Sequence, residues 1–363
     1  MKLGIVGLPN AGKSTLYNAI MQTGAEASNY PFSTVSPNVG RVPVPDERLG
    51  KLNEIYNAKS VIPAAIEMVD IAGLVKGASQ GEGLGNQFLS HIREADALIH
   101  VVRCFEDENV THVHDTIDPI RDIETVNLEL VFADLELLER RIAKVEKVAR
   151  TDKSYKREEE ILRKIIAVLE EGQPSRSIAW DDEDDLKLVE SFTLITQKPM
   201  LYAANISESD LEGGESGALK SLEEFAKSEN TTLFVSCAKL EAEIATLEPE
   251  EKEMFLADMG ISENGLARLI TAGYELLGLI SFLTAGPKEV RAWTVRKNSK
   301  APQAAGKIHS DLERGFIRAE VVAYDDLIAA GTYADAKEKG QVRIEGKEYI
   351  VKDGDVLLIR FNV

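Results

Sequence analysis

Residues 7–14 read Gly7-Leu8-Pro9-Asn10-Ala11-Gly12-Lys13-Ser14, a complete phosphate-binding loop of the form G-x-x-x-x-G-K-S. An apolar run at 3–6, suited to a buried strand, precedes the loop, and residues 14–20 open a helix whose N-terminal dipole favours anions. Glycines let the backbone wrap around a triphosphate, the lysine pairs with its β- and γ-phosphates, and the serine hydroxyl is a ligand for Mg²⁺. We therefore expect nucleotide contacts from Asn10, Ala11, Gly12, Lys13, Ser14 and Thr15.

The composition of the 363 residues, 44% hydrophobic and 28% charged, predicts a folded protein of two or three domains. No apolar run approaches the roughly 20 residues of a membrane span, and the first strand starts too early to follow a signal peptide, so we expect a cytoplasmic protein without membrane contact. Cys104 and Cys237 lack the spacing of a metal or redox site. The net charge of −19 argues against indiscriminate nucleic-acid binding, and we expect no DNA specificity.

A nucleotide-binding domain in two pieces is predicted from the apolar runs. In residues 1–127, strand-like runs at 64–70 and 97–102 alternate with loops and helices. The same texture resumes at 197–277. We assign both pieces to one α/β domain, with an insertion between them.

The insertion at 128–196 is predicted to be a helical arm. Residues 158–171 form a second helical stretch, the tip lies near 151–157, and further helix follows at 184–196. A heptad seam marks the first helix and predicts an antiparallel partner; it comprises Leu128, Val131, Leu135, Leu138, Ile142, Val145 and Ala149. After the second nucleotide-domain piece, residues 278–363 carry short strand-like runs and predict a small β-rich module.

Two further motifs fall where a phosphate sensor requires them. Asp70 ends the strand at 64–70, where a carboxylate supports Mg²⁺, and the N–H of Gly73 is placed to sense a γ-phosphate. Thr34 is our candidate for a second hydroxyl on Mg²⁺, although an ordinary loop threonine fits the same pattern. Glycines at 77, 81, 83 and 85 predict a segment that reorders, as a switch does.

Taken together, these motifs resemble the Obg-related branch of the TRAFAC class of P-loop GTPases; they are residues 7–15, Tyr30-Pro31-Phe32-Ser33-Thr34 and Asp70-Ile71-Ala72-Gly73. The helical insertion and the C-terminal module resemble the YchF subfamily within that branch, in order and over essentially the whole chain. The resemblance implies a P-loop NTPase sheet with an inserted antiparallel coiled-coil arm and a small β-grasp-like TGS domain at 278–363. It also implies a preference for ATP over GTP and association with the ribosome.

The base-recognition motif departs from the GTPase pattern. Guanine-specific members carry Asn-Lys-x-Asp, whose Asp accepts from guanine N1–H and the 2-amino group, whereas this chain has Asn205-Ile206-Ser207-Glu208. The Glu208 carboxylate lies one methylene further out, which loses the paired acceptor geometry, while Asn205 and backbone groups near Ile206 suit adenine. We expect ATP to bind more tightly than GTP. The family's last base-contacting loop, where backbone amides approach the base, matches Ser236, Cys237 and Ala238.

The group that orients the attacking water is not the usual one. Many GTPases place a glutamine after the D-x-x-G motif, but Leu74 stands here, and an apolar side chain cannot orient water. His114, in a polar loop after the strand ending at Arg103, is our candidate, and it joins Lys13 and Gly73 as a catalytic group. The alternative is a solvated loop histidine without a catalytic role. Slow hydrolysis, raised by a partner, is the expected profile.

Two basic patches indicate a contact with RNA. Between residues 140 and 157, eight cations face two acids, which gives +6, and residues 288–318 give +5 from eight cations and three acids. A solvated helical face explains such a run equally well. The expected contact residues are Arg140, Arg141, Lys144, Lys147 and Arg150 in the arm, and Arg291, Arg296, Lys297 and Lys307 in the C-terminal module. Trp293 and Phe316 either stack on bases or belong to the core.

The sequence thus predicts a slow, Mg²⁺-dependent ATPase that acts as a nucleotide-controlled switch on the ribosome or its RNA. Two alternatives stay open. One is a conventional GTPase acting in ribosome assembly or translation. The other is a non-catalytic adaptor, in which nucleotide merely braces the fold.

Overall fold

The computed structural model describes residues 1–26, 39–71, 84–114, 116–211, 216–258 and 265–362. The chain divides into two compact units. The described residues within 1–26, 39–40 and 67–266 belong to the first unit, and those within 41–66 and 267–363 belong to the second. Thr34 and Gly73, two residues expected at the nucleotide, lie outside the described residues.

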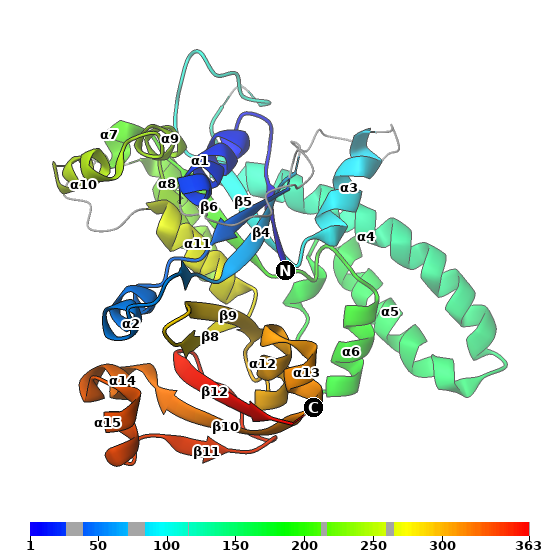
Figure 1. The fold of residues 1–363 in the computed structure, drawn as a ribbon. Helices are drawn as coiled ribbons and strands as arrows, with labels where there is room; N and C mark the ends of the chain where they lie inside the picture. The colour runs from blue at the N-terminus through cyan, green and yellow to red at the C-terminus, as the bar shows by residue number, and fades with distance from the viewer. Residues whose placement is uncertain (27–38, 72–83, 115, 212–215, 259–264, 363) are drawn as a thin grey trace. The chain divides into compact units, whose positions relative to one another are not determined.

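A six-stranded sheet forms the centre of the first unit, as the sequence predicted (Figure 1). Its strands, in spatial order, are β2 (Val39–Pro43), β4 (Ala65–Asp70), β1 (Lys2–Val6), β5 (Ala97–Arg103), β6 (Met200–Asn205) and β7 (Leu233–Ser236). The pairings of β1 with β4 and β5, and of β6 with β5 and β7, are parallel. The register aligns Arg103 with Asn205 and Asn205 with Ser236, so the carboxyl ends of these strands meet at one edge.

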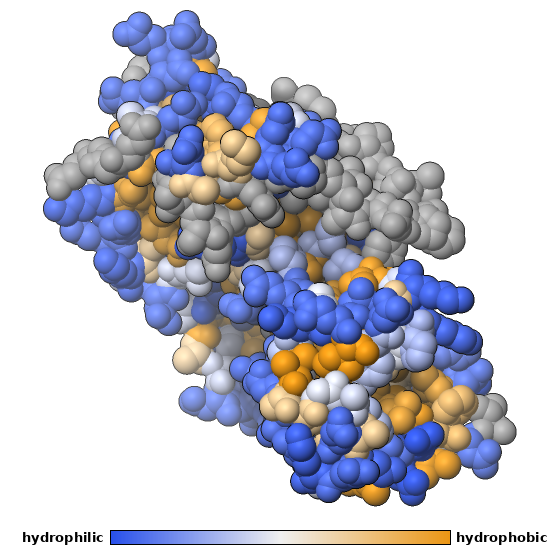
Figure 2. Space-filling model, turned by 60° about the vertical axis from the view of Figure 1, so that its left-hand side comes forward, coloured by the Kyte–Doolittle hydropathy of each residue, from blue (hydrophilic) through white to orange (hydrophobic). Residues whose placement is uncertain are grey.

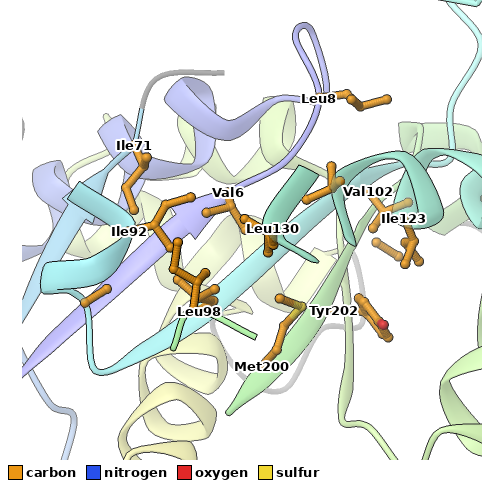
Figure 3. Packing of buried hydrophobic residues seen from close by; sticks show 14 of the residues in the cluster. Val6, Leu8, Ile71, Ile92, Leu98, Val102, Ile123, Leu130, Met200 and Tyr202 are labelled. Carbon is orange, nitrogen blue, oxygen red and sulfur yellow. The ribbon is translucent and has the colours of Figure 1, made fainter. Parts of the chain in front are cut away.

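Helices cover this sheet and share its core. They are α1 (Lys13–Glu26), α3 (Leu84–Glu94), α7 (Glu208–Leu211), α8 (Gly217–Ser228), α9 (Ala238–Ile244) and α10 (Pro249–Asp258). Figure 3 shows Val6, Leu98 and Met200 from three strands in one buried cluster with Ile92 of α3 and Leu130 of the long helix α4 (Pro119–Ala149). The continuous apolar runs of the strands therefore reflect burial within this layered core.

The predicted arm is present and begins earlier than the heptad pattern indicated. α4 (Pro119–Ala149) starts at the sheet, where Asp118 caps it by accepting from Arg121 N at 3.1 Å. The 3-10 turn Lys153–Tyr155 forms the tip, and α5 (Lys156–Glu170) returns alongside α4 (Figure 1). After the 3-10 turn Ser175–Ser177, α6 (Glu183–Ser191) ends before the expected residue 196.

Four of the seven predicted seam residues are buried, Leu135 and Ile142 are half-buried, and Leu128 is exposed. Leu138 and Val145 of α4 pack with Ile161 and Ile165 of α5 in the core of the arm. Leu128 is 42% exposed and does not belong to this core. The reason is that α4 is one continuous helix whose first half covers the sheet, so the position where the pairing with α5 starts is set by the sheet and not by the heptad count.

The second unit contains a mixed sheet, as expected of a small β-rich module. Its spatial order is β11 (Arg343–Glu345), β10 (Phe316–Ala323), β12 (Asp355–Phe361), β8 (Leu279–Ala285), β9 (Val290–Arg296) and β3 (Val61–Ile62). The unit's other helices are α12 (Ala301–Ile308), α13 (Ser310–Arg314), α14 (Tyr324–Ala330) and α15 (Tyr333–Glu338), and α11 (Gly265–Leu276) precedes β8. Phe282 and Phe316 lie in its core.

Residues 41–66 belong to this second unit, although the sequence pattern grouped them with the nucleotide-binding domain. The strand β3 pairs in parallel with β9. Arg48, at the start of α2 (Arg48–Tyr56), forms an ion pair with Asp353 at 2.6 Å. The first contact joins residues 229 positions apart and the second joins residues 305 positions apart, which a local pattern does not reveal.

The surface in the view of Figure 2 is mostly hydrophilic. Apolar residues appear there as separate areas between hydrophilic ones. Among the described residues, no helix combines the length and the apolar character needed to cross a membrane.

Candidate nucleotide site

The phosphate-binding loop leaves β1 and enters α1, as predicted, and its glycines are required by packing inside the protein. Gly7 has φ +149°, and a Cβ on it would lie 2.4 Å from the Val101 carbonyl oxygen of β5. Gly12 has φ +98°, and its Cβ would lie 2.2 Å from Nδ2 of Asn205. Side chains at either position would therefore push the loop away from β5 and β6 as well as from a phosphate.

Lys13 is the buried cation of the loop, with 6% of its surface exposed. Its Nζ donates to the carbonyl oxygen of Leu8 at 2.7 Å, which turns the side chain back over the loop. Burial lowers the pKa of Lys13 to about 8, and the Asp70 carboxylate opposes this shift. A buried ammonium with so little compensation favours an anion beside it.

Ser14 and Asp70 lie together, as expected of a metal site. The Ser14 hydroxyl donates to Asp70 Oδ2 at 3.2 Å. Asp70 Oδ1 is buried, and within the described part of the chain it has no hydrogen-bond partner. A hydroxyl and an unsatisfied carboxylate oxygen beside a phosphate loop are the donors that Mg²⁺ prefers, so these residues fit the predicted ion.

Asn205, at the end of β6, holds two loops together. Its Nδ2 donates to the Ala11 carbonyl oxygen at 3.0 Å, and its Oδ1 accepts from the Ala238 backbone N–H at 2.9 Å. The side chain is 6% exposed. Sequence reasoning gave Asn205 and the Ala238 amide to the base. In the structure Asn205 and the Ala238 amide are bonded to each other. The two bonds of Asn205 join the phosphate loop to the loop of Ser236.

Glu208 and Ile206 face different surroundings from those the motif suggested. Ile206 is buried in the core of the sheet, and its N–H donates to the Ser236 carbonyl oxygen at 3.0 Å. The Glu208 carboxylate forms an exposed ion pair with Lys239 Nζ at 2.9 Å. Lys239 ends the sequence motif Ser236-Cys237-Ala238-Lys239, but its pairing with Glu208 was not predicted. An exposed pair of this kind contributes little to stability, so a nucleotide can displace it.

Both cysteines are free thiols in the core. Burial raises the pKa of Cys104 to about 12 and also raises the pKa of Cys237. Cys237 begins the turn into α9 and is buried next to the loop described above. Neither thiol has the lowered pKa of a reactive cysteine.

The loop that carries His114 contacts the phosphate loop. Asn10, in the left-handed region at φ +63°, donates through Nδ2 to the Thr111 carbonyl oxygen at 3.1 Å. The buried Arg103 holds the loop in place by donating hydrogen bonds to its carbonyl oxygens, including that of Val110 at 3.0 Å. The His114 Nε2 is buried and lacks a hydrogen-bond partner among the residues described. The sequence pointed to His114 but not to Arg103.

Comparison with known proteins agrees with this geometry. Residues 2–134 match the family model MMR_HSR1, described as a 50S ribosome-binding GTPase, and residues 279–362 match YchF-GTPase_C, described as a protein of unknown function (DUF933). The "Ribosome-binding ATPase YchF" of Bacillus subtilis (strain 168) is 58% identical over 364 residues, which cover 99% of both chains. The chain belongs to the YchF family.

More distant members cover the chain equally well. The "Obg-like ATPase 1" of Oryza sativa subsp. japonica is 44% identical, over 100% of this chain and 92% of the rice protein. A solved structure named "Structure of the Schizosaccharomyces pombe YchF GTPase" superimposes with a TM-score of 0.90 at 37% identity, over 99% of this chain and 97% of that one. The fold expected from the resemblance, a P-loop α/β sheet with a C-terminal domain, is therefore confirmed.

The basic patch of this YchF-family arm is partly neutralised in the fold. Arg140 pairs with Glu136, and Arg141 pairs with Glu158 at 2.7 Å while its guanidinium lies over the Phe192 ring. The +6 count along the sequence therefore overstates the free charge. Four of the five predicted contact residues are exposed on α4 and at its end, namely Arg140, Lys144, Lys147 and Arg150, and of these Arg140 is in the ion pair with Glu136.

In the C-terminal module, one of the two candidate stacking residues is core. Phe316 is buried, which removes it from a base-stacking role. Trp293 is half-buried; its Nε1 donates to Thr284 Oγ1 at 3.0 Å, and the guanidinium of Arg291 lies 3.9 Å from its ring centroid. Arg296, Lys297 and Lys307 are exposed.

Proposed function

We propose that this protein is a slow, Mg²⁺-dependent nucleoside triphosphatase that prefers ATP, works as a nucleotide-controlled switch and binds the ribosome in the cytoplasm. The observation that carries the proposal is the cluster of Lys13, Ser14 and Asp70 at the start of α1, with its buried ammonium and unsatisfied carboxylate oxygen. Relatives that match essentially the whole chain carry the name ribosome-binding ATPase.

The phosphate chemistry follows from these side chains. Lys13 releases the Leu8 carbonyl and turns to the β- and γ-phosphates, where its charge offsets the charge that develops as the bond to the γ-phosphate breaks. Ser14 and Thr34 would supply hydroxyl ligands to Mg²⁺, and the Asp70 carboxylate would support the ion. When bound, the ion neutralises phosphate charge and orients the phosphates. Gly73 reads the γ-phosphate through its N–H.

His114 is proposed to orient the attacking water. Its loop is attached to the phosphate loop through Asn10 and Thr111, and its buried Nε2 lacks a partner in the described structure. The group therefore has a free hydrogen-bonding site on a loop that contacts the phosphate loop. Orientation by one side chain, in place of the glutamine of many relatives, suits a slow basal rate that a partner raises.

Preference for ATP rests on Glu208. Its side chain is one methylene longer than that of Asp, which leaves guanine without the two aligned acceptors that its N1–H and 2-amino group require. A site that leaves buried donors of a substrate unpaired discriminates against that substrate. Adenine lacks both donors, so the displaced carboxylate costs it no hydrogen bond.

The switch would act through α3, which follows the predicted γ-phosphate sensor at Gly73. Arg93, in the last turn of α3, donates to the Ala133 carbonyl oxygen at 3.2 Å and pairs with Asp134 at 3.4 Å. The same guanidinium lies 3.5 Å from the Thr193 carbonyl oxygen, where the chain returns from the arm. A displacement of α3 would thus reach both ends of the arm.

Contact with ribosomal RNA is proposed for the exposed cations Lys144, Lys147 and Arg150. Tyr155 in the turn at the tip of the arm is 40% exposed and offers an aromatic ring there. The exposed C-terminal cations Arg296, Lys297 and Lys307 form a second candidate surface. Charge of this kind binds phosphates with a strong dependence on salt.

Competition between ATP and GTP, together with single-turnover hydrolysis measured with and without ribosomes, tests the proposal. We expect ATP to bind at least about tenfold more tightly and ribosomes to raise the rate. Tighter binding of GTP would support the conventional GTPase. Equal rates, with ribosome binding that is independent of nucleotide, would support the adaptor.

A further inference from the structure

His112 lies between a buried carboxylate and the backbone of His114. Its Nε2 is 2.8 Å from Asp122 Oδ2, and both side chains are 5% exposed. Its Nδ1 accepts the His114 backbone N–H at 3.1 Å. A carboxylate only accepts and a backbone N–H only donates, so one tautomer satisfies both bonds: Nε2 carries the proton and Nδ1 is bare.

Asp122 is itself held in place. It belongs to the first turn of the long helix α4, whose cap at Asp118 fixes the backbone of Arg121. The Arg121 guanidinium also donates to the second carboxylate oxygen, Oδ1, at 3.3 Å. The carboxylate is therefore oriented by a helix that is anchored in the sheet core through Ile123 and Val126.

The other side of the loop is held by the phosphate loop. Asn10 Nδ2 donates to the Thr111 carbonyl oxygen at 3.1 Å, and Arg103 Nη1 donates to the same oxygen at 3.4 Å. Thr111 and His112 are consecutive, so one residue is tied to the phosphate loop and the next to α4. The backbone N–H of His114 is bonded to His112, the residue that is attached to α4.

We propose that His112 and Asp122 are positioning residues for His114. The inference rests on the proposed function, in which the His114 ring orients the attacking water. His112 holds the His114 backbone N–H, and Asp122 fixes the His112 ring in the tautomer that can do so. The His114 backbone then has one defined place in the loop that contacts the phosphate loop, and the ring Nε2 has no hydrogen-bond partner among the described residues. A group held in the reactive geometry avoids the entropic cost of finding it.

Two substitutions of His112 separate its two bonds. In His112→Asn the side-chain oxygen lies near the position of Nδ1 and can still accept from His114. In His112→Gln the amide nitrogen lies near the position of Nε2, so the bond to Asp122 persists while the acceptor for His114 is lost. We expect the single-turnover rate of ATP hydrolysis to fall roughly tenfold or more in His112→Gln and clearly less in His112→Asn, because a positioned group contributes about 10²–10⁴-fold. The ATP dissociation constant should stay within about twofold in both variants, because a positioning loss lowers the rate and not ground-state binding.

A double-substitution cycle with His114→Ala distinguishes positioning from folding. If His112 acts through the His114 ring, His112→Gln causes no further slowing once that ring is absent. A merely structural role would slow the His114→Ala protein again and would weaken ATP binding and lower the melting temperature. That outcome overturns the inference.

The cycle also separates this inference from the proposed function. If His114→Ala hydrolyses ATP at the wild-type rate, the catalytic role of His114 is wrong and the inference falls with it. If His114→Ala is slow and His112→Gln is not, only the inference is overturned. Should His112→Gln fail to fold, Asp122 supplies the same test. Asp122→Asn keeps an oxygen that accepts from Nε2–H and should stay near the wild-type rate, whereas Asp122→Ala should be slow; equal rates overturn the inference.

Discussion

Asn205 and Ala11 are 194 residues apart in the sequence, and the side-chain Nδ2 of the first donates to the carbonyl oxygen of the second at 3.0 Å. The same amide accepts from the Ala238 N–H. The residue at the head of the base-recognition motif thus holds the phosphate loop against the last loop of the site. Affinity for nucleotide should depend on it even where it does not touch the base.

Replacement of Asn205 by Ala should therefore weaken ATP binding. The substitution leaves the buried Ala238 N–H without an acceptor, which costs about 1–3 kcal/mol of folding free energy. We expect a melting temperature lower by a few degrees and an ATP dissociation constant raised about tenfold or more, because the two loops lose their alignment.

The matched control is Asn18→Ala, since Asn18 is exposed on the outer side of α1. This variant should melt and bind ATP like the wild type. If Asn205→Ala loses stability but keeps its ATP affinity, the bridge does not organise the site. Calorimetry at one pH and salt concentration measures both quantities.

The sequence located the site well wherever the signal was local. The phosphate loop, Asp70 at the end of β4 and the arm over α4 and α5 were all read from short patterns, and the structure has them there. The strength of those patterns comes from backbone constraints, such as the positive φ of Gly7 and Gly12.

What the sequence missed depends on contacts between distant residues. The pairing of Glu208 with Lys239, the grouping of residues 41–66 with the C-terminal sheet, and the bonds of Arg93 to the arm all join segments far apart in the chain. Leu128 is a residue for which a local pattern predicted a contact that the fold does not make. Its heptad position suggested burial in the seam, but the seam begins further along α4.

The buried ammonium of Lys13 should make ATP binding dependent on pH. Its pKa in the free protein is about 8, so above this pH the free protein loses the proton, whereas bound phosphates hold the proton in place. Affinity should therefore be constant below pH 8 and should fall by up to about tenfold for each pH unit above it.

Proton uptake by the protein when ATP binds would show that Lys13 gains a proton in the complex. Titration calorimetry at pH 9 in buffers of different ionisation enthalpy should show uptake of a proton, and at pH 7 it should show none from this group. Proton release at pH 9, or an affinity that stays constant up to pH 9.5, contradicts the assignment. ATP itself stays fully ionised across this upper range.

Shortening Glu208 should shift the nucleotide preference toward GTP. Glu208→Asp withdraws the carboxylate by one methylene and breaks the 2.9 Å pair with Lys239, which restores the side-chain length used to read guanine. We expect the ratio of GTP to ATP affinity to rise about tenfold, the effect of one well-placed hydrogen-bonding group.

Lys239→Ala is the control for this substitution, because it breaks the same exposed pair and keeps the longer carboxylate. It should leave the ratio of affinities near the wild-type value. An equal rise in both variants would mean that the ion pair, and not the side-chain length, disfavours guanine. Competition against a fluorescent nucleotide measures the ratio directly.

Neutralising the exposed cations of the arm should reduce the salt dependence of ribosome binding. Lys144, Lys147 and Arg150 are exposed, and each cation that contacts a single-stranded phosphate contributes about 0.7 to the slope of log affinity against log salt. Replacement of all three by Gln should therefore lower the slope by about 2. Sedimentation with ribosomes at several salt concentrations measures it.

Lys220 and Lys227 on α8 are exposed lysines outside the arm and provide the control. Their replacement by Gln should leave the slope unchanged. An equal reduction in both sets would indicate a general charge effect. An unchanged slope in the arm variant would exclude these three residues from the RNA contact.

Arg93 should carry the nucleotide signal to the arm. Arg93→Ala removes the bonds from α3 to Asp134, Ala133 and Thr193. The arm root should stay folded, because Asp134 keeps its bonds from the Ile195 N–H and the Thr196 N–H. We expect ATP affinity and basal hydrolysis near the wild-type values.

The coupling itself should be lost. If the wild type binds ribosomes more tightly with a non-hydrolysable ATP analogue than with ADP, Arg93→Ala should reduce that ratio by about fivefold or more, the lower end of typical coupling energies. Arg163→Ala is the matched control, since Arg163 pairs with Glu146 and Glu159 within the arm. A wild-type ratio in Arg93→Ala would show that the nucleotide state reaches the ribosome without passing through the end of α3.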